Sequence, residues 1–154
     1  MSSTQSLTTL LEHAEAERDA ALTALRNTEA AAAAAQGQLD QLKEYRTQYQ
    51  QRWSSQFRQS GSIELLQCYQ GFSQRLDQAI TQQGQVVAQA EQRAQQARAV
   101  VLEREQRVAA VRKLIERRQQ EQNRVAERRD QRATDEAAQR SRANSSSRLT
   151  PSMI

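Results

Sequence analysis

The stretch Gln59-Ser60-Gly61-Ser62-Ile63-Glu64 is the one strong helix break in the interior of this 154-residue chain. Ser60 and Gly61 are suited to ending a helix, with Gly61 supplying the left-handed conformation that commonly follows the last turn. Ser62 is suited to beginning the next helix, because its hydroxyl accepts a hydrogen bond from a free N–H group of the first turn. Glu64 adds favourable negative charge there. The stretch therefore predicts a turn at about residues 59–62 between two helices.

The composition allows little besides helix on either side of this turn. The chain has 24 Ala and 26 Gln, against four Gly, one Pro and six aromatic residues. Hairpins and crossover connections need far more Gly, Asn and Asp, so sheets are excluded and long helices remain. We expect one helix at about residues 7–57, a second at about 63–140, and a disordered tail over 143–154, where three consecutive serines precede Pro151.

Both predicted helices repeat apolar residues at seven-residue spacing in two interleaved series, interrupted in the first helix by Arg18 and Arg46, which is the pattern of a coiled-coil seam. The first helix has the series Leu7, Ala14, Ala21, Thr28, Ala35, Leu42, Tyr49 and the series Leu11, Arg18, Leu25, Ala32, Leu39, Arg46, Trp53. The second has Ile80, Val87, Ala94, Val101, Val108, Ile115, accompanied by Ala90, Ala97 and Val111. Folded back at Gly61, the helices form an all-α antiparallel coiled-coil hairpin, expected to be a single domain over residues 1–142.

Several classes of function are excluded by what the sequence lacks. No stretch approaches the roughly 20 apolar residues of a membrane span, and the N-terminus has no apolar region typical of a secretory signal. The single Cys68 and the single His13 cannot build a disulfide or a metal cluster within the chain. No catalytic triad, paired carboxylates with a base, or phosphate loop is present. We therefore expect a cytoplasmic protein that is not an enzyme and holds no metal or cofactor.

Positive charge gathers toward the C-terminus of a chain whose formal net charge is +4. Residues 104–142 hold twelve basic and seven acidic residues. Such an excess is one sign of a nucleic-acid-binding segment, but the interleaved acids favour ion pairs on a solvated helix face. Arginines in this segment are also suited to steering toward acidic protein surfaces. Two alternatives therefore stay open: a nucleic-acid-binding arm and a plain scaffold or dimerising coiled coil.

All six aromatic residues lie within 28 residues around the turn, and a two-helix seam has room for roughly half of them. In the first helix, Leu42 and Tyr49 share a face with Gln38 and Tyr45. Either Leu42 and Tyr49 belong to the seam, with the other two flanking it, or all four form an exposed recognition stripe. The same two readings apply in the second helix to Phe72, Leu76 and Ala79.

Three blocks of sequence carry a resemblance to a known family. The first is Gln38-Leu39-x-x-Leu42-x-x-Tyr45-x-x-x-Tyr49, and the second is Tyr69-Gln70-x-Phe72-x-x-x-Leu76-x-x-Ala79-Ile80. The third is Arg129-Asp130-Gln131-x-x-x-Asp135-Glu136, continuing to Arg140. With the length and the position of the turn, these blocks resemble the FliJ family of flagellar type III export proteins over about residues 5–142.

The resemblance implies an antiparallel two-helix coiled coil similar to the central stalk subunit of rotary ATPases. It implies a cytoplasmic protein that binds the hexameric flagellar export ATPase and promotes its assembly and turnover. It also implies contact with the cytoplasmic domain of the export gate membrane protein, escort of export chaperones, and a peripheral place at the inner membrane. The equivalent stalk protein of a virulence type III secretion system is the alternative, and no nucleic-acid partner is expected.

The resemblance also assigns candidate binding residues, with no catalytic residue among them. The positions that match the gate-binding face of the family are Gln38, Leu42, Tyr45, Tyr49, Phe72, Leu76 and Ala79. The next position on that face is often His in the family and is Gln83 here. The ATPase ring is expected to contact the paired ends near the termini, where the candidate residues are Arg117, Arg118, Arg124, Arg128, Arg129 and Arg132.

Overall fold

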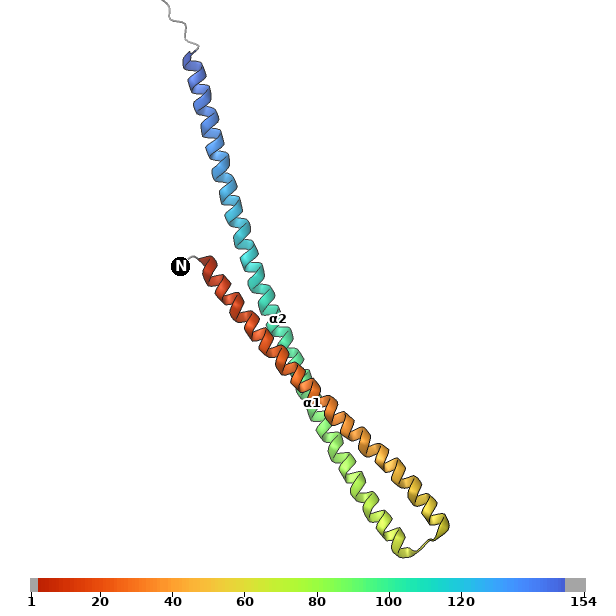
Figure 1. Ribbon diagram of the computed structural model, residues 1–154. Helices are drawn as coiled ribbons and strands as arrows, with labels where there is room; N and C mark the ends of the chain where they lie inside the picture. The colour runs from red at the N-terminus through yellow and green to blue at the C-terminus, as the bar shows by residue number, and fades with distance from the viewer. Residues whose placement is uncertain (1–2, 149–154) are drawn as a thin grey trace, which may run out of the picture. The chain divides into compact units, whose positions relative to one another are not determined.

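Two long helices make up the part of the chain that the computed structural model describes, residues 3–148. Helix α1 runs over Ser3–Gln59 and helix α2 over Ile63–Arg148, joined by residues 60–62 (Figure 1). The all-α class and the position of the turn are therefore confirmed. Contacts divide the chain into two units, one formed by Ala14–Arg107 and the other by Met1–His13 with Val108–Ile154.

Both helices extend further at their outer ends than the sequence indicated. α1 begins at Ser3 instead of about residue 7, and α2 ends at Arg148 instead of about residue 140. The prediction of a disordered tail is therefore wrong for residues 143–148, while residues 149–154 lie outside the described part of the chain. Serine hydroxyls that can compete with helical hydrogen bonds instead donate along the helix. Ser145 Oγ donates to the Ser141 carbonyl at 2.8 Å, and Ser146 Oγ to the Ala143 carbonyl at 3.0 Å.

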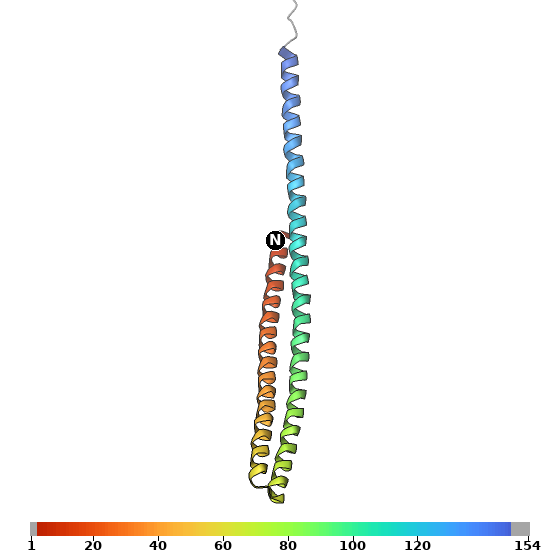
Figure 2. The ribbon, with the colours of Figure 1, turned by 90° about the vertical axis from the view of Figure 1, so that its right-hand side faces the viewer.

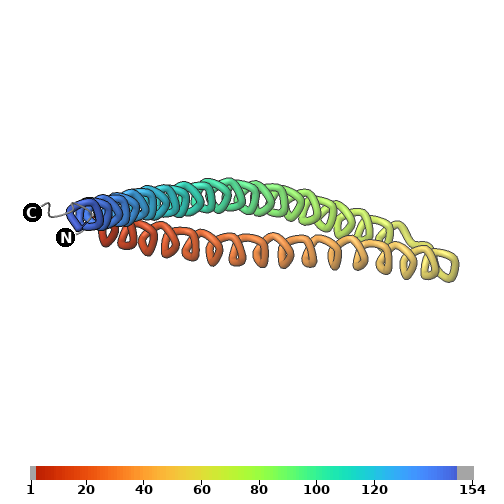
Figure 3. Tube along the Cα trace, turned by 90° about the horizontal axis from the view of Figure 1, so that it is seen from above, coloured from red at the N-terminus to blue at the C-terminus, as the bar shows by residue number. Residues whose placement is uncertain are grey.

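In the unit Ala14–Arg107, the two helices lie side by side and run in opposite directions, as Figures 1, 2 and 3 show from three sides. Contacts between them join early residues of α1 to late residues of α2. Successive pairs along α1 are Glu17 with Arg107, Glu29 with Arg98, Gln38 with Gln83, Arg46 with Asp77, and Trp53 with Tyr69. The predicted antiparallel pairing is confirmed for this unit.

The predicted seam lines the contact between the helices of this unit. Its buried members are Ala14, Ala21, Ala35 and Leu39 on α1 and Leu76, Val87, Ala94 and Val101 on α2. Ala35, Leu39 and Val87 form the centre of a core cluster against which Ile80 and Ala90 pack. Because many of these side chains are small, the helices bury little apolar area per turn. The stability of the pair therefore depends on repeating the same weak contact over many turns.

The two arginines that interrupt the seam of α1 lie at its edges. Arg46 is half-buried, and its Nη1 lies 3.4 Å from Asp77 Oδ1 on the facing helix. Arg18 is also half-buried, and its Nη2 lies 3.1 Å from Oδ1 of the neighbouring Asp19. Long arginine side chains can pack their aliphatic stems against apolar neighbours while the charged group reaches water. The interruptions are thus compatible with a continuous seam.

The second unit combines residues 3–13 of α1 with residues 108–148 of α2, within its described part. Val108 and Val111 are buried, and Leu7, Leu11 and Ile115 are half-buried. Every residue from 116 to 148 is exposed. The core of this unit therefore ends where the sequence repeat ends, at Ile115, and the rest of its helix presents side chains to solvent.

The turn confirms one sequence prediction and corrects another. Ser62 caps α2 as expected, since the Leu65 backbone N–H donates to Ser62 Oγ at 3.2 Å. At the end of α1, the Ser60 N–H donates to the Gln56 carbonyl at 3.0 Å. The left-handed conformation predicted for Gly61 is wrong, because no described glycine has a positive φ. The chain reverses through ordinary backbone conformations, so Gly is not required at this position.

Two substitutions in the turn distinguish the capping role of Ser62 from the position of Gly61, where glycine is not required. Ser62→Ala should lower the free energy of unfolding by about 1 kcal/mol, because it removes the N-terminal cap of α2. Gly61→Ala should be neutral or raise it by up to about 1 kcal/mol, since alanine restricts the unfolded chain. An added Cβ would lie 3.6 Å from the Phe57 carbonyl oxygen, an ordinary contact. Urea unfolding followed by circular dichroism measures both, and a larger loss for Gly61→Ala than for Ser62→Ala would contradict this turn.

Candidate functional site

Six aromatic rings form a connected cluster beside the turn, within the unit Ala14–Arg107. α1 contributes four rings spaced by four residues, and α2 contributes two: Tyr45, Tyr49, Trp53, Phe57, Tyr69 and Phe72. Tyr49 lies at the centre, with its ring centroid 4.1 Å from that of Phe72 and 5.9 Å from that of Tyr69. Aromatic pairs at such separations stabilise by about 0.5–1.5 kcal/mol beyond their buried area. The cluster therefore closes the turn end of the hairpin and presents rings at its surface.

The structure decides between the two readings of this aromatic face. Leu42 and Tyr49 are half-buried in the seam, whereas Gln38 and Tyr45 are exposed beside it. Tyr45 keeps 46% of its surface exposed while its ring meets that of Phe72 edge-on at 6.2 Å. The seam reading is therefore confirmed for Leu42 and Tyr49, and Tyr45 is the ring of the cluster most available to a partner.

The three remaining candidates for gate binding lie on α2 and differ in exposure. Phe72 and Ala79 are half-buried, whereas Leu76 is buried with 7% of its surface exposed. Leu76 therefore supports the face from beneath and offers little area of its own. All seven candidates lie in one unit, but their role in binding the gate stays a prediction.

A groove lies beside the cluster on the α1 side, with a volume of ≈ 440 Å³. Its lining combines rings with polar side chains, namely Tyr45, Tyr49, Arg52, Trp53, Ser55, Gln56 and Gln59. Tyrosine, tryptophan and arginine are the residue types that most often dominate the energy of protein interfaces. The turn end is therefore suited to binding a protein surface that offers both apolar and polar groups.

Gln83 makes a contact that the sequence reasoning missed. Its Nε2 donates to the Ala35 carbonyl at 3.0 Å and to Gln38 Oε1 at 3.2 Å, from the facing helix. The only sequence signal was a polar residue at a seam position. A polar residue at such a position can specify the register of a coiled coil. Gln83 thus holds Gln38, one of the predicted gate-binding residues, beside the seam.

A charged network joins the helices at the other end of the same unit. Glu17 Oε2 accepts from Arg107 Nη1 at 2.9 Å and lies 3.8 Å from Arg104 Nη1. Arg107 Nη2 also donates to Glu103 Oε1, one turn earlier in α2, at 3.4 Å. Each exposed pair of this kind stabilises by about 0.2–1 kcal/mol. Their value here is that they favour one alignment of α1 on α2.

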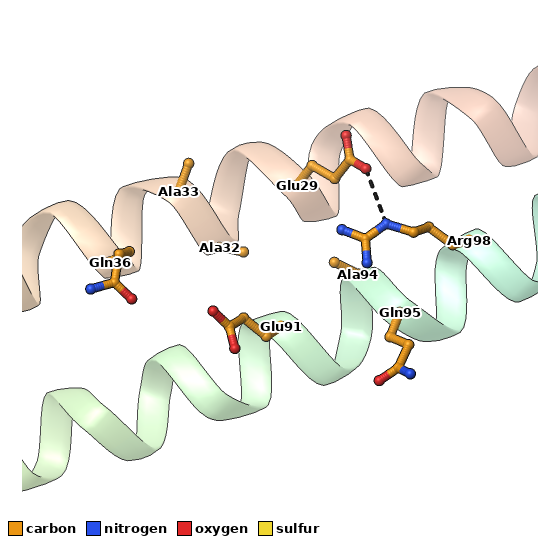
Figure 4. A pocket seen from close by; sticks show the side chains of 8 residues that line it. All are labelled: Glu29, Ala32, Ala33, Gln36, Glu91, Ala94, Gln95 and Arg98. Atoms are coloured by element: carbon orange, nitrogen blue, oxygen red, sulfur yellow. Dashed lines mark hydrogen bonds and ion pairs between the residues drawn. The ribbon is translucent and has the colours of Figure 1, made fainter.

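A wider groove of ≈ 650 Å³ lies between the helices where α1 carries its run of alanines. Figure 4 shows the groove from close by, with Ala32 and Ala94 leaving room between the two backbones. Glu29 and Arg98 face one another across it, with Glu29 Oε1 3.4 Å from Arg98 Nε. Glu91 also lines this side. The side is therefore strongly polar.

The candidate ATPase-binding arginines all lie in the exposed part of α2 in the second unit. They are Arg117, Arg118, Arg124, Arg128, Arg129 and Arg132. Arg118 and Arg129 line a groove of ≈ 470 Å³ that also includes Ser3, at the start of α1. None of the six forms an ion pair with another residue of the described range 3–148.

The expected pairs with interleaved acids are present at Arg104 and Arg107, each with Glu103, but not at these six arginines within the described range 3–148. Exposed pairs along one helix gain only about 0.3–0.5 kcal/mol, and ordering two long side chains offsets that gain. The guanidinium groups remain in solvent and are free to bind acidic groups of another molecule. Their binding to an ATPase ring stays a prediction.

The described residues also bear on membrane and metal binding. Over residues 3–148, neither helix contains a segment long and apolar enough to cross a membrane. Within the same range, no three side chains of His, Cys, Asp or Glu gather closely enough to hold a metal ion. Cys68 has a free, exposed thiol on α2.

These observations define a helical protein in which a narrow apolar seam pairs two long helices, while aromatic and arginine side chains are exposed on its surface. The family described as "Flagellar FliJ protein" has a sequence model that matches residues 3–147, nearly the whole chain. The chain therefore belongs to the FliJ family, whose role is in flagellar protein export and which is not a known family of enzymes. Comparison with curated proteins and with solved structures gave no match.

The aromatic cluster predicts a difference between two tyrosines one turn apart. Tyr49→Ala should lower the free energy of unfolding by about 2 kcal/mol, because Tyr49 is half-buried and contacts four other rings. Tyr45→Ala should cost less than about 1 kcal/mol, since Tyr45 is largely exposed. Urea unfolding of the two variants tests this difference, and equal losses would place Tyr45 in the core.

Proposed function

We propose that this chain is a central-stalk-like component of the flagellar type III export apparatus, acting in the cytoplasm on the hexameric export ATPase. The family match over residues 3–147 carries the proposal. The paired helices of Ala14–Arg107 and the exposed, mostly polar part of α2 support it, because a stalk needs a stiff coiled coil and a segment free to enter a ring. The chain promotes ring assembly and turnover without carrying out catalysis itself.

The contact with the ATPase is assigned to the second unit. The six unpaired arginines named above lie on α2, and each can form a two-pronged hydrogen-bonded pair with a carboxylate. Solvent-exposed charges of one sign also accelerate the encounter with an oppositely charged surface. The ring surface that they meet is therefore expected to be acidic. A nucleic-acid-binding arm is the competing role that the same unpaired arginines would serve.

The contact with the cytoplasmic domain of the export gate is assigned to the turn end. Tyr45 offers an exposed ring and a hydroxyl, Phe72 supports it edge-on, and the exposed Gln38 lies about two turns earlier on the same face of α1. This surface and the arginine segment lie in different units, so the gate and the ATPase need not compete for the same residues. Binding to these partners would account for peripheral association with the inner membrane and for a role in motility. Escort of export chaperones belongs to the same proposal.

The ATPase contact is tested with charge reversals. Arg118→Glu combined with Arg129→Glu should abolish most of the increase in ATP turnover and hexamer content that the unmodified chain gives to a purified flagellar export ATPase. Arg140→Glu combined with Arg142→Glu is the matched control, since both residues are exposed on the same helix outside the candidate set. Failure of the unmodified chain to affect the ATPase, together with tight RNA binding at physiological salt, would favour the nucleic-acid role.

The gate contact is tested at Tyr45. Tyr45→Ala should weaken binding to the purified cytoplasmic domain of the gate by about tenfold or more, as expected for a tyrosine at the centre of an interface. Thr47→Ala is the control, because Thr47 is exposed nearby and its hydroxyl bonds only within its own helix, to the Lys43 carbonyl at 3.1 Å. Isothermal titration calorimetry gives the affinities. Unchanged binding by Tyr45→Ala with helicity retained would remove this residue from the site.

A further inference from the structure

In the middle of the unit Ala14–Arg107, the two sides of the hairpin differ in charge. Residues that flank the seam of a two-helix coiled coil are commonly charged on both sides. Here one side carries Glu29, Lys43, Asp77, Glu91, Arg98 and Glu105, and is called the charged flank. The other side, called the apolar flank, carries Ala24, Ala31, Ala79, Val86, Arg93 and Val100 in this middle part; the same series also holds Gln38 and Arg52 and, at its outer end, the ion-paired Glu17 and Arg107. On each helix the flank residues recur at multiples of seven, so each set keeps to one side of the seam.

Contacts between the helices confirm that each flank is continuous from α1 to α2. On the charged flank, Glu29 meets Arg98 (Figure 4). On the apolar flank, Ala31 and Arg93 line one small groove of ≈ 190 Å³, together with Asn27, Thr28 and Ala90. The rings of Tyr45 and Phe72, which meet at 6.2 Å, belong to the same seven-residue series as Ala31 and Arg93. The apolar flank thus continues from the aromatic cluster along the paired helices.

Two valines on the apolar flank are more exposed than their chemistry favours. Val86 is 48% exposed and Val100 is 41% exposed. They lie 14 residues apart on α2, which corresponds to about 21 Å of helix. On α1 the same series has the exposed alanines Ala24 and Ala31, followed by the exposed Gln38. Over Ala24 and Ala31 a second apolar surface would meet no bulky side chain of α1, so its backbone could approach both helices closely there.

Arg93 is the one charged member of the apolar flank between Ala79 and Val100. It is exposed and makes no ion pair or hydrogen bond with another residue of the described range 3–148. A single unpaired cation within an apolar stripe favours an occupant that brings a carboxylate to this point. Two copies of this chain related by a twofold axis here would place Arg93 against Arg93. The charge therefore favours a different protein over a second copy.

We propose that the apolar flank binds an amphipathic helix of a partner protein, which packs beside α1 and α2 and pairs an acidic residue with Arg93. The apolar face of that helix covers Val86 and Val100, and the small residues of α1 allow the interhelical distance of about 8–10 Å that helix packing needs. Apolar anchors spaced by three and four residues are the usual means by which a helix binds such a groove. The result is a local three-helix bundle next to the aromatic cluster.

This site lies on the same side of the hairpin as the gate-binding candidates Tyr45 and Ala79, but the residues that test it, Val86, Arg93 and Val100, belong to neither the gate nor the ATPase candidates. Substitution of Val86, Arg93 or Val100 therefore tests this site without changing any residue proposed to bind the gate or the ATPase. The site is a third protein-binding surface of the chain. Its ligand is an acidic, amphipathic helix of at least about four turns.

The test uses a pair of synthetic peptides as probes for the full chain. Both are amphipathic helices of about 21 residues with leucines at heptad spacing, and they differ only in a central Glu or Lys. Fluorescence anisotropy should show the Glu peptide binding about tenfold more tightly than the Lys peptide, which corresponds to about 1.4 kcal/mol. Arg93→Glu should reverse this preference. Equal affinities for the two peptides, or no reversal, would overturn the assignment of Arg93.

A matched pair of surface changes tests the apolar contact. Val86→Lys combined with Val100→Lys should reduce binding of the Glu peptide by about tenfold or more. Leu102→Lys is the control, because Leu102 is 58% exposed on the same helix and lies one heptad beyond Gln95, which lines the groove on the charged flank. Circular dichroism verifies that all variants keep their helicity. An equal loss with Leu102→Lys would overturn the choice of flank.

Self-association is the remaining outcome to be measured. Sedimentation equilibrium should give the same oligomeric state for the unmodified chain and for the variant that combines Val86→Lys with Val100→Lys. If a dimer forms and these substitutions dissociate it, a second copy covers the apolar flank and the proposal of a partner helix is overturned.

Discussion

Mutual pairing of two helices along one narrow seam is the constraint on which the rest of the described structure depends. A helix that buries no apolar face has little to stabilise it in water, and the seam of small and medium residues buries only one face of each helix. Ala35, Leu39 and Val87 at its centre show how thin this core is. Outside the seam no residue of the described range 3–148 is buried, so the chemistry that remains for function lies on the surface.

The same pairing decides which side chains meet at that surface. Phe72 reaches Tyr49 because antiparallel alignment brings the first turns of α2 beside the last turns of α1. At the opposite end of that unit, Glu17 meets Arg107 for the same reason. Between them Gln83 bonds across the seam to the Ala35 carbonyl, which a small side chain leaves accessible. A shift of one heptad would separate all of these pairs, so the interaction surfaces exist only in this register.

Much of this arrangement could be predicted from the sequence, because it depends on periodicity. The seven-residue series identified the seam residues on both helices, and Ser62 identified the start of α2 through its capping hydroxyl. The features that the sequence did not predict depend on local backbone conformations that are similar in free energy. Gly61 was expected to be left-handed although the turn closes without it, and the serines before Arg148 continue the helix by bonding to its carbonyls. The contacts of Gln83 require knowing how far α1 lies from α2, which no pattern along one chain gives.

The most direct test of this account is the register of the hairpin. In a Cys68→Ala background, Ala35→Cys and Val87→Cys should form a disulfide within one chain, because these residues pack together in the core cluster. Ala35→Cys with Ala94→Cys should not, since one heptad displaces the partner by about 10 Å, beyond the Cα separation that a disulfide tolerates. Non-reducing electrophoresis and mass spectrometry distinguish the products. Efficient cross-linking of both pairs, or cross-links only between chains, would contradict the antiparallel register on which the proposed surfaces depend.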